Sequence, residues 1–377
     1  MKKTTFSILC IEAGVLSFSV AASAALIPSI ASDFSIEQFI AARIVWLYML
    51  SYGIAALFYG PLIRAFNAKK VELVFFALFV ISNFAAAASK SIFWLSASRL
   101  MMGVFGASVI PLGLIIIAKR CPLESRGRMV GVFFGCAFIA SLLGLFLSGV
   151  LHWRMAYLLP AIAGSGLWVA MLLFLPDFKK EQDGLSVNYL RAFKDRRVLT
   201  VFSYIFLVSL FYHGVQQWLA VYFSIALSYS QFLISMLITL TSLSGVFGEL
   251  IGGVLADSFG RRKTVNTGII LMILSALPLM LKIPLIWIIA LAMVIWGLGW
   301  TFNHAGLSTM LTDLPAEFLN EAASLNSGLR FLAGGVGVWL AGLVMQKSFV
   351  FGFSTFACGL FLLLIIGNKV IQREGIK

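Results

Sequence analysis

The segment from Asp177 to Arg197 has the sequence DFKKEQDGLSVNYLRAFKDRR and is the longest polar stretch in a chain of 377 residues. Long apolar runs lie on both sides of it. Over the whole chain 61% of the residues are hydrophobic and 11% are charged, and the mean hydropathy is +1.00. Soluble domains carry about 25% charged residues. The composition therefore excludes an ordinary soluble protein and indicates a chain that crosses a membrane several times.

The apolar runs are long enough to be transmembrane helices, each of which needs about 20 consecutive, mainly apolar residues. Six such runs precede the polar segment and six follow it. The predicted spans are 5–30, 40–62, 71–89, 92–117, 129–151, 155–176, 198–226, 229–256, 265–282, 285–311, 322–346 and 348–370. We therefore expect an all-α integral membrane protein with an N-terminal half at 1–176, a linker at 177–197 and a C-terminal half at 198–377.

The positive charges are spread as short clusters between the apolar runs, although the formal net charge is +13. This pattern favours a topology signal over a nucleic-acid-binding surface. Lys and Arg concentrate in the N-terminus, the linker and the loops on the same side. The positive-inside rule then places both termini and the linker in the cytoplasm. The first apolar stretch runs from Phe6 to Ile30, longer than the core of a cleaved signal, and predicts a retained helix.

The four cysteines, Cys10, Cys121, Cys136 and Cys358, are far apart and have no histidine nearby. They form neither a zinc motif nor a disulfide framework. The sequence implies no metal and no cofactor.

An internal repeat appears when the chain is shifted by 193 residues. The shift aligns glycines, prolines and aromatic residues in pairs, among them Gly60 with Gly253, Phe66 with Phe259, Trp94 with Trp287, Gly106 with Gly299, Pro122 with Pro315, and Gly144 with Gly337. Each copy holds six helices, an even number, so both copies enter the membrane in the same direction. This predicts a parallel repeat, from which some transporters build a central site between two halves.

Residues 253–262, GVLADSFGRR, resemble the hallmark loop Gly-x-Leu-Ala-Asp-x-x-Gly-Arg-Arg of the major facilitator superfamily. Further resemblance lies in Arg99 with Gly103, in Glu124–Arg128 and in Trp153–Arg154, and the stretch 312–337 looks like the drug exporter and sugar efflux branch. The resemblance covers essentially the whole chain. It implies a secondary transporter, not an enzyme, whose gating loop contains Gly253, Asp257, Gly260, Arg261 and Arg262.

Elementary chemistry gives this loop a physical interpretation. We expect Gly253 to allow two helices to approach, Gly260 to adopt a positive φ, and Asp257 to accept hydrogen bonds from a helix N-terminus or to pair with a loop arginine. The first copy has Arg64 and Asn67 where the family has aspartate and glycine, so its latch should be weak. The proline that proton antiporters of the family often carry in helix five is missing, which leaves the transport direction open.

Ionisable residues within membrane spans are functional candidates because burying a charge in the bilayer is costly. Glu12, Arg99, Glu249 and Arg330 are predicted to form a proton-coupling or charge network, with Glu12 the better proton carrier. For Arg99 a role in proton transfer is implied by the family resemblance alone. The alternatives are a hydrated Glu12 near the interface, an Arg99 that caps carbonyls, and a structural ion pair between Glu249 and Arg330.

Helices seven and ten usually line the cavity in the family that the chain resembles. Aromatic rings with a few amides suit an amphipathic or aromatic solute. The candidate substrate residues are Tyr212, His213, Gln216, Gln217, Trp296, Trp300, Asn303 and His304. Helix packing and interfacial aromatic belts explain the same residue types.

The leading hypothesis is a transporter of the bacterial inner membrane that exports a small amphipathic or aromatic compound by alternating access, driven by protons. Its partners would be the small-molecule substrate, protons and the lipid bilayer, and it would act as a monomer. The alternative is a proton-linked uptake permease or a facilitator. An enzyme is disfavoured because His152, His213 and His304 are separated, and a nucleotide-driven pump because no Gly-x4-Gly-Lys-Ser/Thr occurs. A non-transporting sensor would not need buried charges on several helices.

Overall fold

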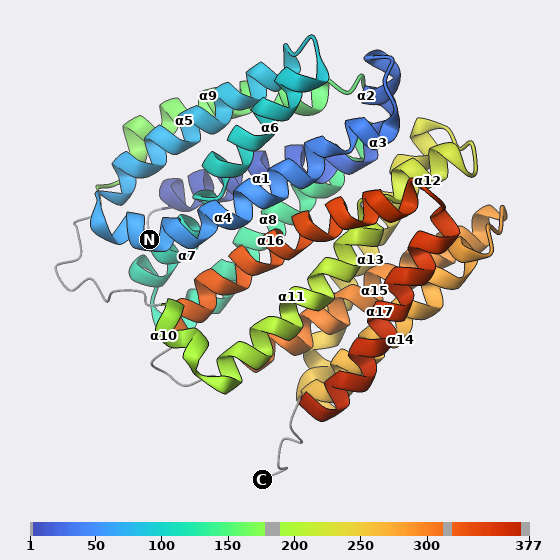
Figure 1. The fold of residues 1–377 in the computed structure, drawn as a ribbon. Helices are drawn as coiled ribbons and strands as arrows, with labels where there is room; N and C mark the ends of the chain where they lie inside the picture. The colour runs from blue at the N-terminus through green and yellow to red at the C-terminus, as the bar shows by residue number, and fades with distance from the viewer. Residues whose placement is uncertain (1–2, 178–188, 312–318, 371–377) are drawn as a thin grey trace. The chain divides into compact units, whose positions relative to one another are not determined.

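A computed structural model describes residues 3–177, 189–311 and 319–370, and these residues contain helices and no strand. Twelve of the described helical segments are long and apolar enough to cross a membrane. The all-α expectation and the six-plus-six order are therefore confirmed. The chain divides into two compact units, Met1–Val187 and Asn188–Lys377, which Figure 1 shows in blue to green and in yellow-green to red.

The boundary between the units falls inside the expected linker, of which residues 178–188 lie outside the described part. The described linker residues 189–197 are mainly helical. Unit 1 contains α1 (Lys3–Ala25), α2 (Ile27–Asp33), α3 (Gln38–Ala41), α4 (Arg43–Ala65), α5 (Ala68–Ala87), α6 (Ile92–Gly106), α7 (Val109–Arg120), α8 (Leu123–Ser148) and α9 (Met155–Phe174). Unit 2 contains α10 (Tyr189–Lys194), α11 (Arg196–Gln216), α12 (Leu219–Ile225), α13 (Gln231–Ser258), α14 (Arg261–Met280), α15 (Ile286–Leu311), α16 (Leu319–Met345) and α17 (Phe349–Val370).

Four of the predicted spans are interrupted helices, and the second span is interrupted at Ala42, between α3 and α4. The first ends at Ala25 and continues as α2, whose first turn contains Pro28. The fourth is interrupted between Gly106 and Val109. Because Pro111 has no N–H, it cannot bond to the carbonyl four residues earlier, which explains the interruption of the fourth span. The seventh span is interrupted between α11 and α12, where no proline occurs.

Helix starts follow local capping chemistry. The Asn67 side chain accepts a hydrogen bond from the Lys70 N–H at the start of α5, and Asp195 accepts from Arg197 and Val198 at the start of α11. Such side-chain acceptors satisfy backbone N–H groups that have no partner within the helix. The cap at Asn67 begins α5 three residues before the predicted span and so places Glu72 inside the helix.

The repeat is visible in helix packing. In unit 1, α1 packs on α8 and α9, and α5 packs on α6 and α9; in unit 2 the corresponding helix α11 packs on α16 and α17, and α14 packs on α15 and α17. Gly144 lies against the Phe18 carbonyl, and its repeat partner Gly337 lies against the Leu210 carbonyl. A side chain at either glycine would collide with backbone, so both copies need glycine for close helix approach.

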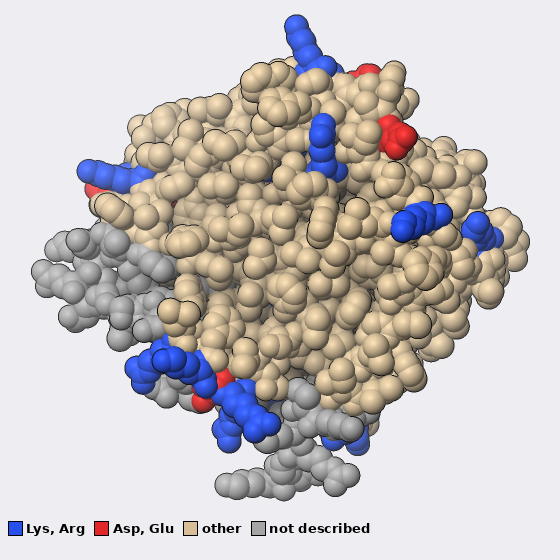
Figure 2. Space-filling model, viewed as in Figure 1, with Lys and Arg blue, Asp and Glu red and all other residues tan. Residues whose placement is uncertain are grey.

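The outer surface is largely apolar. Figure 2 shows a face on which Lys, Arg, Asp and Glu are few and most atoms belong to other residues. Large exposed side chains include Phe58, Leu173, Val254 and Trp287. A surface of this kind fits contact with lipid tails, while several charged groups are buried inside the units.

Candidate functional site

A pair of carboxyl groups is buried in unit 1. Glu12 on α1 and Glu72 on α5 are each 0% exposed, and the two carboxyl groups lie close enough to interact directly. The Ser108 hydroxyl donates to Glu72 Oε1 at 3.1 Å. Ser108 lies at the interruption between α6 and α7, which brings its side chain to α5. Among the described residues, Ser108 is thus the one side chain outside the pair that donates a hydrogen bond to it.

No cation neutralises this pair within the described part of the chain. The salt bridges there involve His152, Arg154 and His304, and none reaches Glu12 or Glu72. Neither oxygen of Glu12 has a conventional hydrogen-bond partner, and Glu72 Oε2 has none. Two adjacent carboxylates in a low-dielectric interior repel each other and lose hydration, so the favourable state of such a pair retains a proton. The arrangement can therefore take up and release a proton.

Glu72 was not among the candidates from the sequence, although it is the second residue of the predicted span 71–89. The Asn67 cap places it in the second turn of α5. The available signal was local: Glu72 is flanked by Val71, Leu73 and Val74 and is followed by a long apolar run. The alternative of a hydrated Glu12 near the interface does not hold, since its side chain is fully buried.

Arg99 occupies a separate buried site in unit 1. Its Nε donates to the Ile44 carbonyl at 3.1 Å, and its guanidinium carbon lies 4.3 Å from the Tyr48 ring centre. The side chain is 1% exposed, and no carboxylate of the described residues pairs with it. The carbonyl contact matches the capping alternative, and the cation–π contact adds to it. A part in proton transfer stays a prediction.

An aromatic cluster forms in unit 2 where α11 meets α15. Tyr212 and Trp300 stack with centroids 3.9 Å apart and an interplanar angle of 9°, and Trp296 lies 5.4 Å from Tyr212 at 16°. Trp296 Nε1 donates to Gln216 Oε1 at 2.8 Å. The His213 ring lies 5.5 Å from Trp300. Five of the residues expected near the substrate thus come together: Tyr212, His213, Gln216, Trp296 and Trp300. Their contact with substrate stays a prediction.

Two charged groups adjoin this cluster. The Glu249 carboxylate on α13 lies 2.8 Å from His304 Nδ1 on α15. Arg330 on α16 lies with its guanidinium carbon 5.8 Å from the Trp300 ring centre, and its Nε donates to Asn326 Oδ1 at 2.8 Å. The alternative of a structural ion pair between Glu249 and Arg330 is therefore not found, because Glu249 pairs with His304 instead. Glu249 and Arg330 still influence each other electrostatically.

Other residues singled out from helices seven and ten lie away from the cluster. Asn303 is 0% exposed, donates to the Val265 carbonyl and contacts Gly268, so it packs α15 against α14. Trp218 donates to the Val338 carbonyl and packs on Gly342. Gln217 follows the last residue of α11, and its side chain makes no hydrogen bond among the described residues. Asn303 therefore matches the helix-packing alternative. Its neighbour in the sequence, His304, contacts Glu249 instead.

The hallmark segment, residues 253–262 at the end of α13 and the start of α14, agrees with one expectation and corrects two. Gly260 has φ +92°, as predicted for its turn, and Arg261 and Arg262 begin α14. Gly253 does not mediate helix approach, since nothing lies within 4 Å of where its Cβ would be; the neighbouring Gly252 contacts Phe302 and Ala305 instead. Asp257 has no hydrogen-bond or ion-pair partner among the described residues. The Arg64 side chain, in the first copy of the loop, lies outside the described part.

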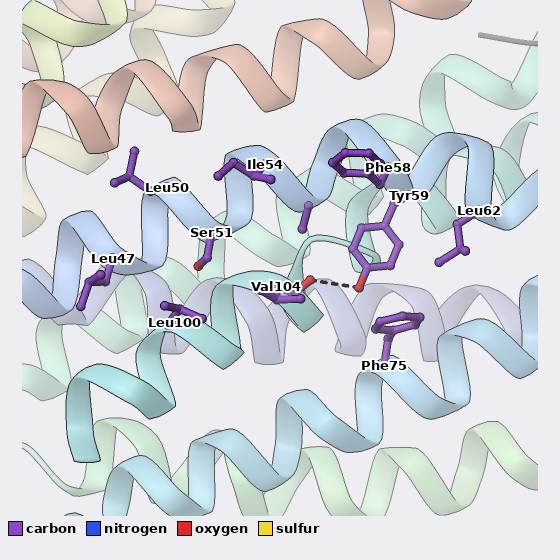
Figure 3. A pocket seen from close by; sticks show the side chains of 11 residues that line it. Leu47, Leu50, Ser51, Ile54, Phe58, Tyr59, Leu62, Phe75, Leu100 and Val104 are labelled. Carbon is purple, nitrogen blue, oxygen red and sulfur yellow. Dashed lines mark hydrogen bonds between the residues drawn. The ribbon is translucent and has the colours of Figure 1, made fainter. Parts of the chain in front are cut away.

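A cavity in unit 1 has a volume of about 590 Å³ and lies between α4, α5 and α6. Figure 3 shows Leu47, Ile54, Phe58 and Phe75 around it, with the Tyr59 hydroxyl donating to the Val104 carbonyl. Its lining contains no charged residue, so it suits an apolar group and not an anion. Among the described residues no cluster of His, Cys, Asp and Glu has the makings of a metal site.

Comparison with known proteins places the chain in a family. Residues 9–338 match the family model of the Major Facilitator Superfamily. The chain is 22% identical over 338 residues to the uncharacterized MFS-type transporter YwfA of Bacillus subtilis (strain 168), covering 86% of this chain and 80% of YwfA. It is 20% identical over 329 residues to a probable sugar efflux transporter of Helicobacter pylori (strain ATCC 700392 / 26695), covering 86% and 83%.

A solved structure shares the fold. The crystal structure of a D-xylose-proton symporter aligns with a TM-score of 0.77 over 97% of both chains, at 14% identity. Such low identity supports the fold alone. The family match across most of the chain, the twelve candidate spans and this shared fold agree with the resemblance seen in residues 253–262. The chain belongs to the major facilitator superfamily and is a membrane transporter, not an enzyme.

Proposed function

We propose that the chain is a proton-coupled exporter of a small amphipathic or aromatic organic compound, acting by alternating access between its 1–176 and 198–377 halves. It would work as a monomer in the bacterial inner membrane with both termini in the cytoplasm. The observation that carries the proton coupling is the carboxyl pair of Glu12 and Glu72, fully buried and without a neighbouring cation in the described residues.

The aromatic cluster supports the substrate class. Tyr212, Trp296 and Trp300 offer stacked ring faces, and Gln216 and His304 add polar groups beside them. Such a surface suits a flat organic molecule better than a small inorganic ion. Export is favoured by the similarity to a protein named as a probable sugar efflux transporter. The likeness in fold to a D-xylose-proton symporter makes proton-linked uptake the alternative.

The direction of transport is tested in intact cells. Small molecules are compared between cells with and without the chain, in the medium and in the cytoplasm. An exporter lowers the internal level of its substrate, and an uncoupler abolishes that difference. A compound whose internal level rises on expression would identify an uptake permease and reject export.

The coupling is tested with the identified compound in proteoliposomes under an imposed pH gradient. A gradient of one pH unit supports at most about tenfold accumulation per coupled proton, because 1.4 kcal/mol corresponds to tenfold. We expect Glu12→Gln and Glu72→Gln to lose this accumulation while retaining substrate exchange across the membrane. Glu37→Gln, which changes an exposed carboxylate in the same unit, is the matched control. Full gradient-driven accumulation in both buried-site variants would overturn the coupling proposal.

A further inference from the structure

The side chain of Arg330 presents unused hydrogen-bond donors inside unit 2. It is 7% exposed, and its Nε donates to Asn326 at 2.8 Å. Its Nη1 and Nη2 atoms are buried and have no hydrogen-bond partner among the described residues. A guanidinium has five N–H donors, so four remain unsatisfied. Burying a charged group without partners is costly, and an arginine fork held in this way matches a carboxylate.

The nearest candidate for an internal partner is already engaged. The Glu249 carboxylate lies 2.8 Å from His304 Nδ1 and does not form a salt bridge with Arg330. The Glu249 and His304 side chains are 40% and 31% exposed, so the edge of the cluster where the His304 ring lies 6.0 Å from Trp300 is open. The Asn326 contact orients the guanidinium through Nε and leaves its two terminal nitrogens available.

An aromatic surface adjoins the free donors. The guanidinium carbon of Arg330 lies 5.8 Å from the Trp300 ring centre, and Trp300 stacks on Tyr212. The Nδ1 atom of His213, another neighbour of Trp300, is also buried without a hydrogen-bond partner. A ligand placed here would meet a bidentate donor at one end and stacked rings beside it.

We propose that this site binds an aromatic monocarboxylate, with its carboxylate on Arg330 Nη1 and Nη2 and its ring against Trp300 and Tyr212. One negative charge is favoured because Glu249 already acts on Arg330, so a second ligand charge would lack a cation. The inference rests on the proposed transport function, because the aromatic monocarboxylate would be the class of substrate that the chain transports. The binding itself requires neither a proton gradient nor a known direction of transport.

Equilibrium binding to the purified chain in lipid nanodiscs tests the site. The probes are radiolabelled benzoate, 1-naphthoate and indole-3-acetate, which differ in ring size, each compared with its neutral amide. We expect at least one acid to bind the unmodified chain about tenfold or more tightly than its amide, because charge-assisted hydrogen bonds to the guanidinium are lost in the amide. Equal affinities for every acid and its amide, or binding of none of the acids, would overturn the proposal.

Variants locate the binding at Arg330. Arg330→Gln should weaken binding of the acid by about tenfold or more and leave the amide unchanged, and Arg330→Lys should fall between. Arg197→Gln removes an exposed arginine of the same unit and should leave both affinities unchanged. Wild-type affinity for the acid in Arg330→Gln would exclude the site.

A variant that binds the acid more tightly separates the charge argument from damage to the fold. Glu249→Gln removes the competing negative charge and should tighten acid binding by about threefold or more without affecting the amide, a result that a damaged protein cannot give. Weaker or unchanged acid binding in Glu249→Gln would contradict the charge argument. Loss of acid binding alongside intact proton-driven export of a neutral compound would reject this inference and leave the proposed function standing.

Discussion

Replacing Asp33 with alanine should destabilise unit 1 through a junction between α2, α5 and α9. Asp33 Oδ2 accepts hydrogen bonds from Trp153 Nε1 at 3.0 Å and from Arg154 Nη2 at 3.2 Å. Arg154 Nη1 in turn donates to the carbonyls of Ala87, the last residue of α5, and of Ser89 just beyond it, at 2.8 and 2.7 Å. One carboxylate therefore connects the start of α9 to the end of α2, while the arginine bonded to it reaches the end of α5.

The expected loss follows from the burial of each partner. Trp153 is 0% exposed, so removing its acceptor leaves a buried N–H unsatisfied, at about 1–3 kcal/mol. The ion pair with Arg154 contributes only about 0.2–1 kcal/mol, because the Arg154 and Asp33 side chains are 31% and 36% exposed and solvent screens them. The midpoints of these two ranges add to about 2–3 kcal/mol for Asp33→Ala. Asp33→Asn keeps an acceptor oxygen and should cost about 1 kcal/mol.

Thermal unfolding of the purified chain in detergent measures this loss. A thiol-reactive dye reports exposure of the buried free cysteines Cys10 and Cys121, in a background where the exposed Cys358 is serine. The midpoint for Asp33→Ala should fall by about 4–12 °C, with Asp33→Asn between it and the parent. Asp177→Ala changes an exposed carboxylate of the same unit and should shift the midpoint by about 2 °C or less. Equal midpoints for the Asp33→Ala and Asp177→Ala variants would refute the junction.

Three other substitutions test the packing and the loop. Gly144→Ala should destabilise the chain by about 1–3 kcal/mol, because its Cβ meets the Phe18 backbone, whereas Gly135→Ala, with open space, should not; equal unfolding midpoints would contradict the close-approach argument. Gly260→Ala should cost about 1 kcal/mol or more because of its φ of +92°, and a neutral result in the same dye assay would argue against that turn. Gly253→Ala should be neutral or slightly stabilising, by up to about 1 kcal/mol, because it lies within a helix and has no close neighbour; a marked loss would restore the packing role first expected for it.

Much of the architecture follows from composition and pattern. Segment 177–197 separates six apolar runs from six others. A bilayer admits only helices and closed barrels, and runs of about 20 apolar residues have the length of spanning helices, so length and hydropathy are sufficient to predict the class. The positive φ at Gly260 followed from residue type alone, since glycine adopts that conformation at little cost. The interruption near Pro111 was also present in the sequence, although the spans were drawn through it.

Candidate residues at single positions were predicted less well, because hydropathy gives the depth of a side chain and not its partner. Asn303 and His304 are adjacent, yet one packs on α14 and the other pairs with Glu249. The same limit explains why Gly253 was chosen in place of Gly252, which lies one residue and about 100° around the helix away.

Composition and the 193-residue repeat were enough to predict twelve membrane-crossing helices in two similar sets, because an apolar run of about 20 residues satisfies its backbone hydrogen bonds in hydrocarbon by forming a helix. The pairing of Glu12 with Glu72, and the open donors of Arg330 beside Trp300, depend on which helix faces meet. These groups are 60 and 30 residues apart along the chain, so contact between them arises only when α1 packs near α5 and α15 near α16.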